Sequence, residues 1–132
     1  MIELRRNGKR LEFVTSDITD ILGISDYDVG ELVRTHLLEP AVSANKARSW
    51  RAEDIFRGFV AIVLVQEFED KYGSKKYKAF KYKQVRYDLI GAIRKPERFL
   101  ETPEWEAVVE RAREQGINFA GTNLDYTGVK KS

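Results

Sequence analysis

The stretch TSDITDILGISDYDVGELVRTHLL, residues 15–38, decides the fold of this chain. Ser16 and Ser25 each precede an aspartate, which is typical of helix starts because a hydroxyl and an early carboxylate stabilise the first turn. The pattern predicts one helix from Asp17 to Leu22 and a second from Asp26 to Thr35. Gly23 ends the first helix, since glycine adopts positive φ without steric cost.

The spacing of small and apolar residues predicts how these two helices meet. A helix-turn-helix needs a close contact, a tight turn and a shared apolar corner. Thr19, four residues before Gly23, supplies the small contact residue. Val29, six residues after the glycine, and Leu32 supply the apolar corner. The stretch therefore predicts a helix-turn-helix unit.

Shorter signals place the remaining elements around this unit. Asn7-Gly8 favours a tight turn, which predicts a hairpin within an extended segment at 1–14. Residues 52–72 predict a long helix, and Thr102-Pro103 predicts the start of another that reaches Gln115. Residues 75–95 fit a helix, although alternating aromatic residues leave a strand open. We expect a mainly α fold with a small β-hairpin or wing and additional C-terminal helices.

Composition excludes several classes of site. The 132 residues contain no cysteine and one histidine, His36, which excludes disulfides, a cysteine nucleophile, thiolate zinc sites and a two-histidine metal site within one chain. No phosphate-cradling glycine loop or nucleophile–base pair is visible, so we expect no enzyme activity, cofactor or metal. The longest uncharged apolar run, residues 58–65, is far shorter than the roughly 20 residues of a membrane span, and the N-terminus lacks a signal peptide's apolar stretch. We expect no membrane contact and a cytoplasmic, nucleoid-associated location.

Charge is distributed unevenly along the chain. The net charge is +2, yet residues 71–98 hold 10 Lys and Arg against 2 Asp and Glu. A basic block in an otherwise mildly acidic chain indicates contact with a local polyanion. Within the block, lysines are interleaved with Tyr77, Phe80, Tyr82 and Tyr87. This favours either base stacking or a solvated helix face whose aromatic side is buried.

Two motifs follow the helix-turn-helix stretch. Leu37-Leu38-Glu39-Pro40 comes directly after the second helix, and Arg48-Ser49-Trp50-Arg51-Ala52-Glu53-Asp54-Ile55 leads into the long helix. In this order and at this distance, residues 15–95 resemble the MerR-type winged helix-turn-helix domain, whose wing commonly ends in Arg-x-Tyr-x-x-x-Asp and an aliphatic residue. The chain departs from that pattern by Trp50 in place of tyrosine and by Gly30-Glu31 in the second helix. We expect a winged helix-turn-helix at 1–98, a C-terminal helical appendage at 99–120, a flexible tail at 121–132 and no effector domain.

The resemblance implies binding of double-stranded DNA by a homodimer, as a transcriptional regulator or a DNA-organising factor. The second helix would enter a major groove and the wing would lie beside the backbone. Basic side chains suit this task because they remain charged beside phosphates. The expected DNA-contacting residues are Ser25, Asp26, Tyr27, Gly30, Arg34, Lys46, Arg48, Arg51, Arg57, Lys75, Lys76, Lys78, Lys81 and Lys83. The expected dimer contacts are Phe59, Ile62 and Val63 of the long helix or Trp105 and Val109 of the terminal helix.

The acidic second helix leaves another function open. Asp26, Asp28 and Glu31 repel phosphates, although a carboxylate can accept a hydrogen bond from the amino group of cytosine. The same scaffold is then expected to act as a protein-interaction adaptor, such as an antitoxin-like or phage accessory protein. Such an adaptor presents the acidic helix to a basic protein partner.

Overall fold

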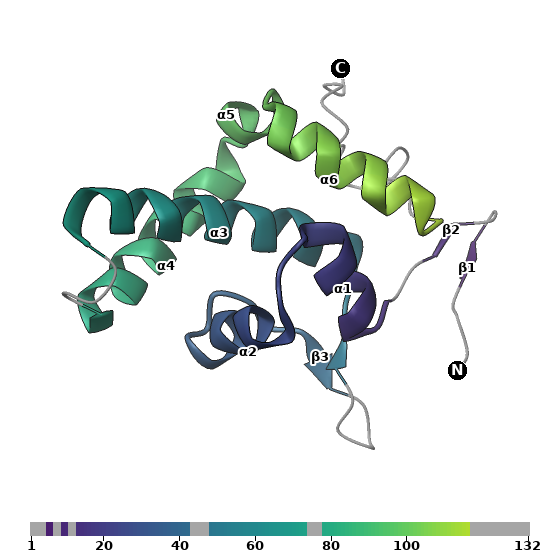
Figure 1. The fold of residues 1–132 in the computed structure, drawn as a ribbon, viewed down its shortest axis with the longest axis horizontal. Helices are drawn as coiled ribbons and strands as arrows, with labels where there is room; N and C mark the ends of the chain where they lie inside the picture. Colours follow the sequence, from purple (N-terminus) through teal and green to yellow (C-terminus); the bar gives the residue numbers. More distant parts are fainter. Residues whose placement is uncertain (1–4, 7–8, 11–12, 43–47, 74–77, 117–132) are drawn as a thin grey trace.

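Helices dominate the computed structural model of this chain (Figure 1). The structure describes residues 5–6, 9–10, 13–42, 48–73 and 78–116. The expected mainly α fold with a small β-hairpin is confirmed, and the strand alternative is wrong for residues 78–94, which form a helix. In chain order the elements are β1 (Arg5–Arg6), β2 (Lys9–Arg10), α1 (Thr15–Leu22), α2 (Asp26–Arg34), β3 (Ala41–Val42), β4 (Arg48–Ser49), α3 (Ala52–Tyr72), α4 (Lys78–Arg94), α5 (Glu97–Leu100) and α6 (Pro103–Glu114).

The strands form two short antiparallel pairs. β1 pairs with β2, with Arg6 opposite Lys9, and β3 pairs with β4, with Val42 opposite Arg48. The Asn7-Gly8 turn lies outside the described residues, but the strands on either side of it pair as the sequence predicts. Each pair is only two residues long, so neither provides a sheet on which helices could pack. The core is therefore made mainly by helices.

A tight turn joins α1 to α2. Gly23 adopts a φ of 70°, and its N–H donates to the Thr19 carbonyl at 2.8 Å. The Ile24 N–H donates to the same carbonyl at 3.1 Å, which satisfies the end of α1. Ile18 of α1 and Val29 of α2 are completely buried at the corner between the helices. The tight turn at Gly23 and the burial of Val29 that the sequence predicts are thus present.

The first turn of α1 differs from the prediction. The helix begins at Thr15 rather than Asp17, and Ser16 lies inside its first turn. The Asp17 carboxylate accepts a hydrogen bond from the Val14 N–H at 3.1 Å. Because this carboxylate satisfies an N–H at the helix start, the Ser16 hydroxyl is not needed as a cap.

Helix α3 is the central element, with α6 above it and α2 and β3 below it in the view of Figure 1. Ile55, Phe56 and Val60 are completely buried along it. Gly58 allows the close approach of α1, since a Cβ at this position would lie 2.9 Å from Leu22 Cδ1. Helix α4 packs along α3 through Val85 and other apolar residues.

Helix α6 packs against both α1 and α3. The Trp105 indole is completely buried, with its ring centroid 5.1 Å from that of Phe56 and 5.2 Å from that of Phe59. Thr102 caps the helix as expected, because its hydroxyl accepts the Trp105 N–H at 3.1 Å. The division at residue 98 remains a prediction, and the expected tail at 121–132 lies outside the described residues.

Candidate nucleic-acid interface

The N-terminus of α2 is held by a reciprocal cap. The Asp28 N–H donates to Ser25 Oγ at 3.1 Å, and the Ser25 N–H donates to Asp28 Oδ2 at 3.3 Å. Ser25, Asp26 and Asp28 are exposed. The cap and the positive end of the helix stabilise this local negative charge. The hydroxyl of Ser25 therefore has a structural task beside its expected contact with DNA.

The outer face of α2 carries Tyr27, Glu31 and Arg34. Tyr27 is 73% exposed, and the Arg34 guanidinium forms an ion pair with Glu31. The hydrogen bond to Glu31 raises the pKa of the Tyr27 phenol, and a hydrogen bond to the same carboxylate raises the pKa of Arg34. Arg34 therefore stays charged, but part of its charge is directed at Glu31. Gly30 lies on the same helix, where a Cβ would meet no atom within 4 Å.

The β3–β4 hairpin is rooted by Trp50. This indole is completely buried, and its Nε1–H donates to Thr15 Oγ1 at 3.0 Å. The backbone of Trp50 pairs with Phe13 through hydrogen bonds of 2.8 and 3.0 Å. The neighbouring arginines, Arg48 and Arg51, are exposed. Arg48 thus lies on strand β4 and Arg51 at the start of α3, on either side of the Trp50 anchor to α1, while Lys46 lies outside the described residues.

Arg57 is engaged within the protein. Its Nε–H donates to the Leu37 carbonyl at 2.9 Å, and the side chain is half-buried. Leu37 and Leu38 are completely buried, and both N–H groups donate to the Leu32 carbonyl. Arg57 therefore stabilises the segment between α2 and β3, and its expected contact with a phosphate remains a prediction.

The expected lysine block is not one cationic face. Lys81 is 3% exposed, and its Nζ lies 2.8 Å from Glu69 Oε2, so it serves an internal ion pair rather than DNA. Lys83 is exposed. Lys75 and Lys76 lie outside the described residues, and the backbone of Lys78 begins α4. Helical periodicity predicts that one side of α4 is buried, but not that a lysine on that side is paired.

Three expected dimer contacts belong to the core of one chain. Trp105 is completely buried, and Phe59 and Val109 are 7% and 9% exposed. Their assignment to a dimer contact is corrected, because packing between α3 and α6 already covers them. Ile62 and Val63 are half-buried and keep part of their surface accessible.

Two arginines that the sequence reading missed hold the helix ends. Arg86 Nη1 donates to the Thr35 carbonyl at the end of α2 at 2.8 Å. Arg111 Nε donates to the Ile21 carbonyl near the end of α1 at 2.7 Å. Helix C-termini carry unpaired carbonyls and partial negative charge, which attract cations. This general rule predicts that cations lie near helix C-termini. The residues around each helix end do not indicate which distant arginine reaches it.

No helix within the described ranges is both long and apolar enough to cross a membrane. The same part of the chain contains no group of three or more His, Asp or Glu side chains placed to hold a metal ion. Comparisons with protein-family models, curated proteins and solved structures find no match to this chain. The functional interpretation therefore depends on the motifs and on the geometry described above.

Proposed function

We propose that this protein binds duplex DNA through a winged helix-turn-helix formed by α1, α2 and the β3–β4 hairpin. The observation that carries the proposal is the hairpin itself. It is the next element after α2, is tied to α1 through Trp50, and exposes Arg48, and Arg51 is exposed just after it at the start of α3. Guanidinium groups bind phosphates in a fork and remain charged, so a hairpin rooted in this way suits contact with a DNA backbone.

Helix α2 would then face the bases. Tyr27 and Arg34 are exposed on it, and the Glu31 partner of Arg34 can accept from a cytosine amino group. If Arg34 contacted a guanine, its guanidinium would first have to leave the ion pair with Glu31. The loss of that ion pair would offset part of the binding free energy gained from the guanine. The proposed site is therefore one in which phosphate contacts dominate affinity and base contacts add modest selectivity.

A homodimer is part of the proposal. Two copies double the phosphate contacts and read two half-sites, which a single small module does weakly. The proposed role is that of a transcriptional regulator or DNA-organising factor in the cytoplasm.

The test is fluorescence anisotropy with a mixed pool of short duplexes at several salt concentrations. For each wing, Arg48→Ala/Arg51→Ala should reduce the slope of log affinity against log salt by about 2, because each phosphate contact contributes about 0.9. The matched control is Arg94→Ala/Arg113→Ala, which removes two exposed arginines from α4 and α6. An absence of binding at low salt, or an equal loss in the control, would refute the proposal.

A protein-interaction adaptor is the second candidate function. The observation that favours it is that Asp28 and Glu31 line a cavity between α2, α3 and α4. If duplexes do not bind, this acidic surface becomes the place to search for a basic partner.

A further inference from the structure

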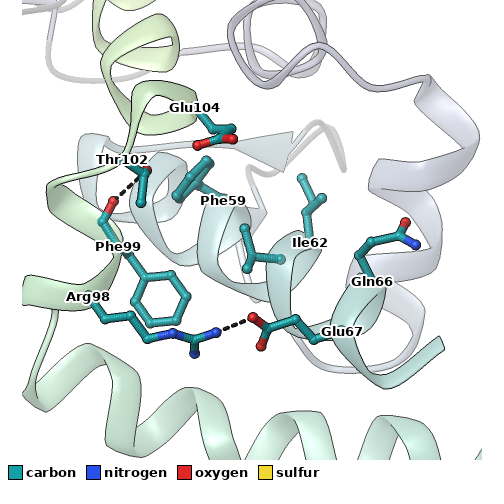
Figure 2. Close-up of a pocket in the computed structure, with 9 residues that line it drawn as sticks. Phe59, Ile62, Gln66, Glu67, Arg98, Phe99, Thr102 and Glu104 are labelled. Atoms are coloured by element: carbon teal, nitrogen blue, oxygen red, sulfur yellow. Dashed lines mark hydrogen bonds and ion pairs between the residues drawn. The ribbon is translucent and has the colours of Figure 1, made fainter. Parts of the chain in front are cut away.

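A groove crosses the exposed part of α3. One cavity of about 390 Å³ lies between α3, α5 and the start of α6 (Figure 2). A second cavity of about 280 Å³ lies between α2, α3 and α4. Ile62 and Gln66 line both cavities, so the two adjoin at these residues, and together they are called the groove.

The floor of the groove is apolar. Figure 2 shows Phe59, Ile62 and Phe99 around the first cavity. Ile62 is half-buried, so part of an aliphatic side chain faces the groove rather than the core. The remaining apolar side chains that line the groove are Ile24, Leu32, Val63 and Val65. A floor of this kind favours contact with apolar side chains of a ligand.

The rim of the groove is acidic. Arg98 is the single basic residue among the described residues that line it, and it forms an ion pair with Glu67 (Figure 2). Two other carboxylates are also paired, Glu31 with Arg34 and Glu69 with Lys81. The carboxylates of the rim are Asp28, Glu31, Glu67, Glu69 and Glu104.

Glu104 and Gln66 leave acceptor oxygens available to a ligand. No described residue forms an ion pair or hydrogen bond with the Glu104 carboxylate, which is exposed in the first turn of α6. The Gln66 amide nitrogen donates to Asp70 Oδ1 at 2.9 Å, so its carbonyl oxygen can still accept. The groove therefore offers a carboxylate at its α6 end and an acceptor oxygen at its centre.

We infer that this groove docks a cationic amphipathic segment of a protein partner. Apolar side chains of the segment would cover Ile62 and Phe99, and lysine or arginine heads would reach Glu104 at one end and Asp28 at the other. Long basic side chains suit both parts, because their methylene stems pack on apolar surface while the charge stays at the rim. An amphipathic segment laid in a groove is a recurring mode of peptide recognition.

Charge separates this surface from the proposed DNA-binding one. Phosphates would be repelled by the acidic rim, whereas Arg48 in β4 and Arg51 at the start of α3 lie outside the groove lining. The net charge of the whole chain is +2, so general attraction of a basic peptide to the protein is not expected. Binding of such a peptide would have to come from the local rim. The inference does not depend on DNA binding.

The test uses two synthetic helical peptides that share the same leucines, one with a lysine-rich polar face and the other with a glutamate-rich polar face. Each is titrated into the full chain and followed by amide chemical shifts and by fluorescence anisotropy. The lysine peptide should bind and shift the resonances of Ile62, Gln66 and Glu104. The glutamate peptide should bind at least tenfold more weakly.

Two variants test the location, each with a matched control. Gln66→Lys places a cation at the centre of the groove and should weaken the lysine peptide about tenfold. Gln84→Lys is the control, since Gln84 makes the same amide–carboxylate bond to Asp88 at 3.0 Å but lies outside the groove lining. Glu104→Gln should weaken the peptide about threefold, whereas Glu106→Gln in the same helical turn should leave binding within twofold.

Three outcomes would overturn the inference. One is equal binding of both peptides, which would indicate apolar adhesion. A second is that the chemical-shift changes map to residues away from α3, or that they are the same in both groove variants as in the wild type. The third is self-association of the chain that Gln66→Lys abolishes, since a second copy would then occupy the groove. Loss of DNA binding in the Arg48→Ala/Arg51→Ala variant leaves the peptide titration unchanged, so the two proposals fail separately.

Discussion

Replacement of Trp105 by alanine tests whether α6 is part of the folded core. The indole is completely buried between α3 and α6, with Phe56 and Phe59 rings about it at 5.1 and 5.2 Å. Burial of about 200 Å² of aromatic surface contributes about 5 kcal/mol as an upper limit, and tryptophan-to-alanine changes in cores cost about 3–5 kcal/mol. We expect the free energy of unfolding to fall by about 4 kcal/mol, much of the 5–15 kcal/mol typical of a domain.

The assay is urea unfolding followed by far-UV circular dichroism, with a thermal melt as a second measurement. At about 3–4 °C per kcal/mol for a chain of this size, the midpoint temperature should fall by about 12–16 °C. Tyr87→Ala is the control, because this side chain is 73% exposed and its loss should change stability by less than about 0.5 kcal/mol. A loss below about 1 kcal/mol for Trp105→Ala would refute the packing of α6 against α3 and would support residues 99–120 as a separate appendage.

Three further predictions concern single buried or crowded positions. Burial raises the pKa of the Asp54 carboxyl, so the free energy of unfolding should fall as pH rises from about 4 through that raised pKa. Asp54→Asn should remove this decline in urea titrations at a series of pH values. Identical pH profiles for the variant and the wild type would contradict the prediction. Lys81→Met leaves Glu69 without its partner and should lower the free energy of unfolding by about 2 kcal/mol. The loss is smaller than for a fully buried pair because the Glu69 side chain is 25% exposed. The double variant Lys81→Met/Glu69→Met should recover part of this loss. Gly58→Ala should lower the free energy of unfolding by about 1 kcal/mol in the same assay, because a Cβ would crowd Leu22 of α1. At Gly91 a Cβ would meet no atom within 4 Å, so Gly91→Ala should raise the free energy of unfolding by about 0.5–1 kcal/mol.

Local chemistry explains the parts of the fold that the sequence predicts. Ser25 caps α2 and Thr102 caps α6 at the expected positions, since a cap depends only on residues within one turn. Gly23 adopts the positive φ that the turn requires, and Gly73 follows the last residue of α3. Ser16 is the exception, because Asp17 satisfies the same helix start from a neighbouring position.

The candidate site is only partly predictable. Arg48 and Arg51 are exposed, as the wing motif leads one to expect. Arg57 and Lys81 belong to the same basic set by residue type, yet one bonds the Leu37 carbonyl and the other pairs with Glu69. A residue type shows that a side chain can bind an anion, whereas its position in the fold decides whether that anion is a phosphate or a group of the protein itself.

The sequence by itself determined the order of α1, α2, α3 and α6, the turn at Gly23 and the surplus of basic residues, because periodicity, caps and composition act over a few residues. Only the tertiary structure decided what each helix covers. Arg111 reaches the Ile21 carbonyl across 90 positions of sequence, and Trp105 packs on Phe56. The acidic groove over Ile62 arises in the same way, since most of its lining residues come from five different helices. Contacts of this range depend on how helices pack in three dimensions, which no local pattern encodes.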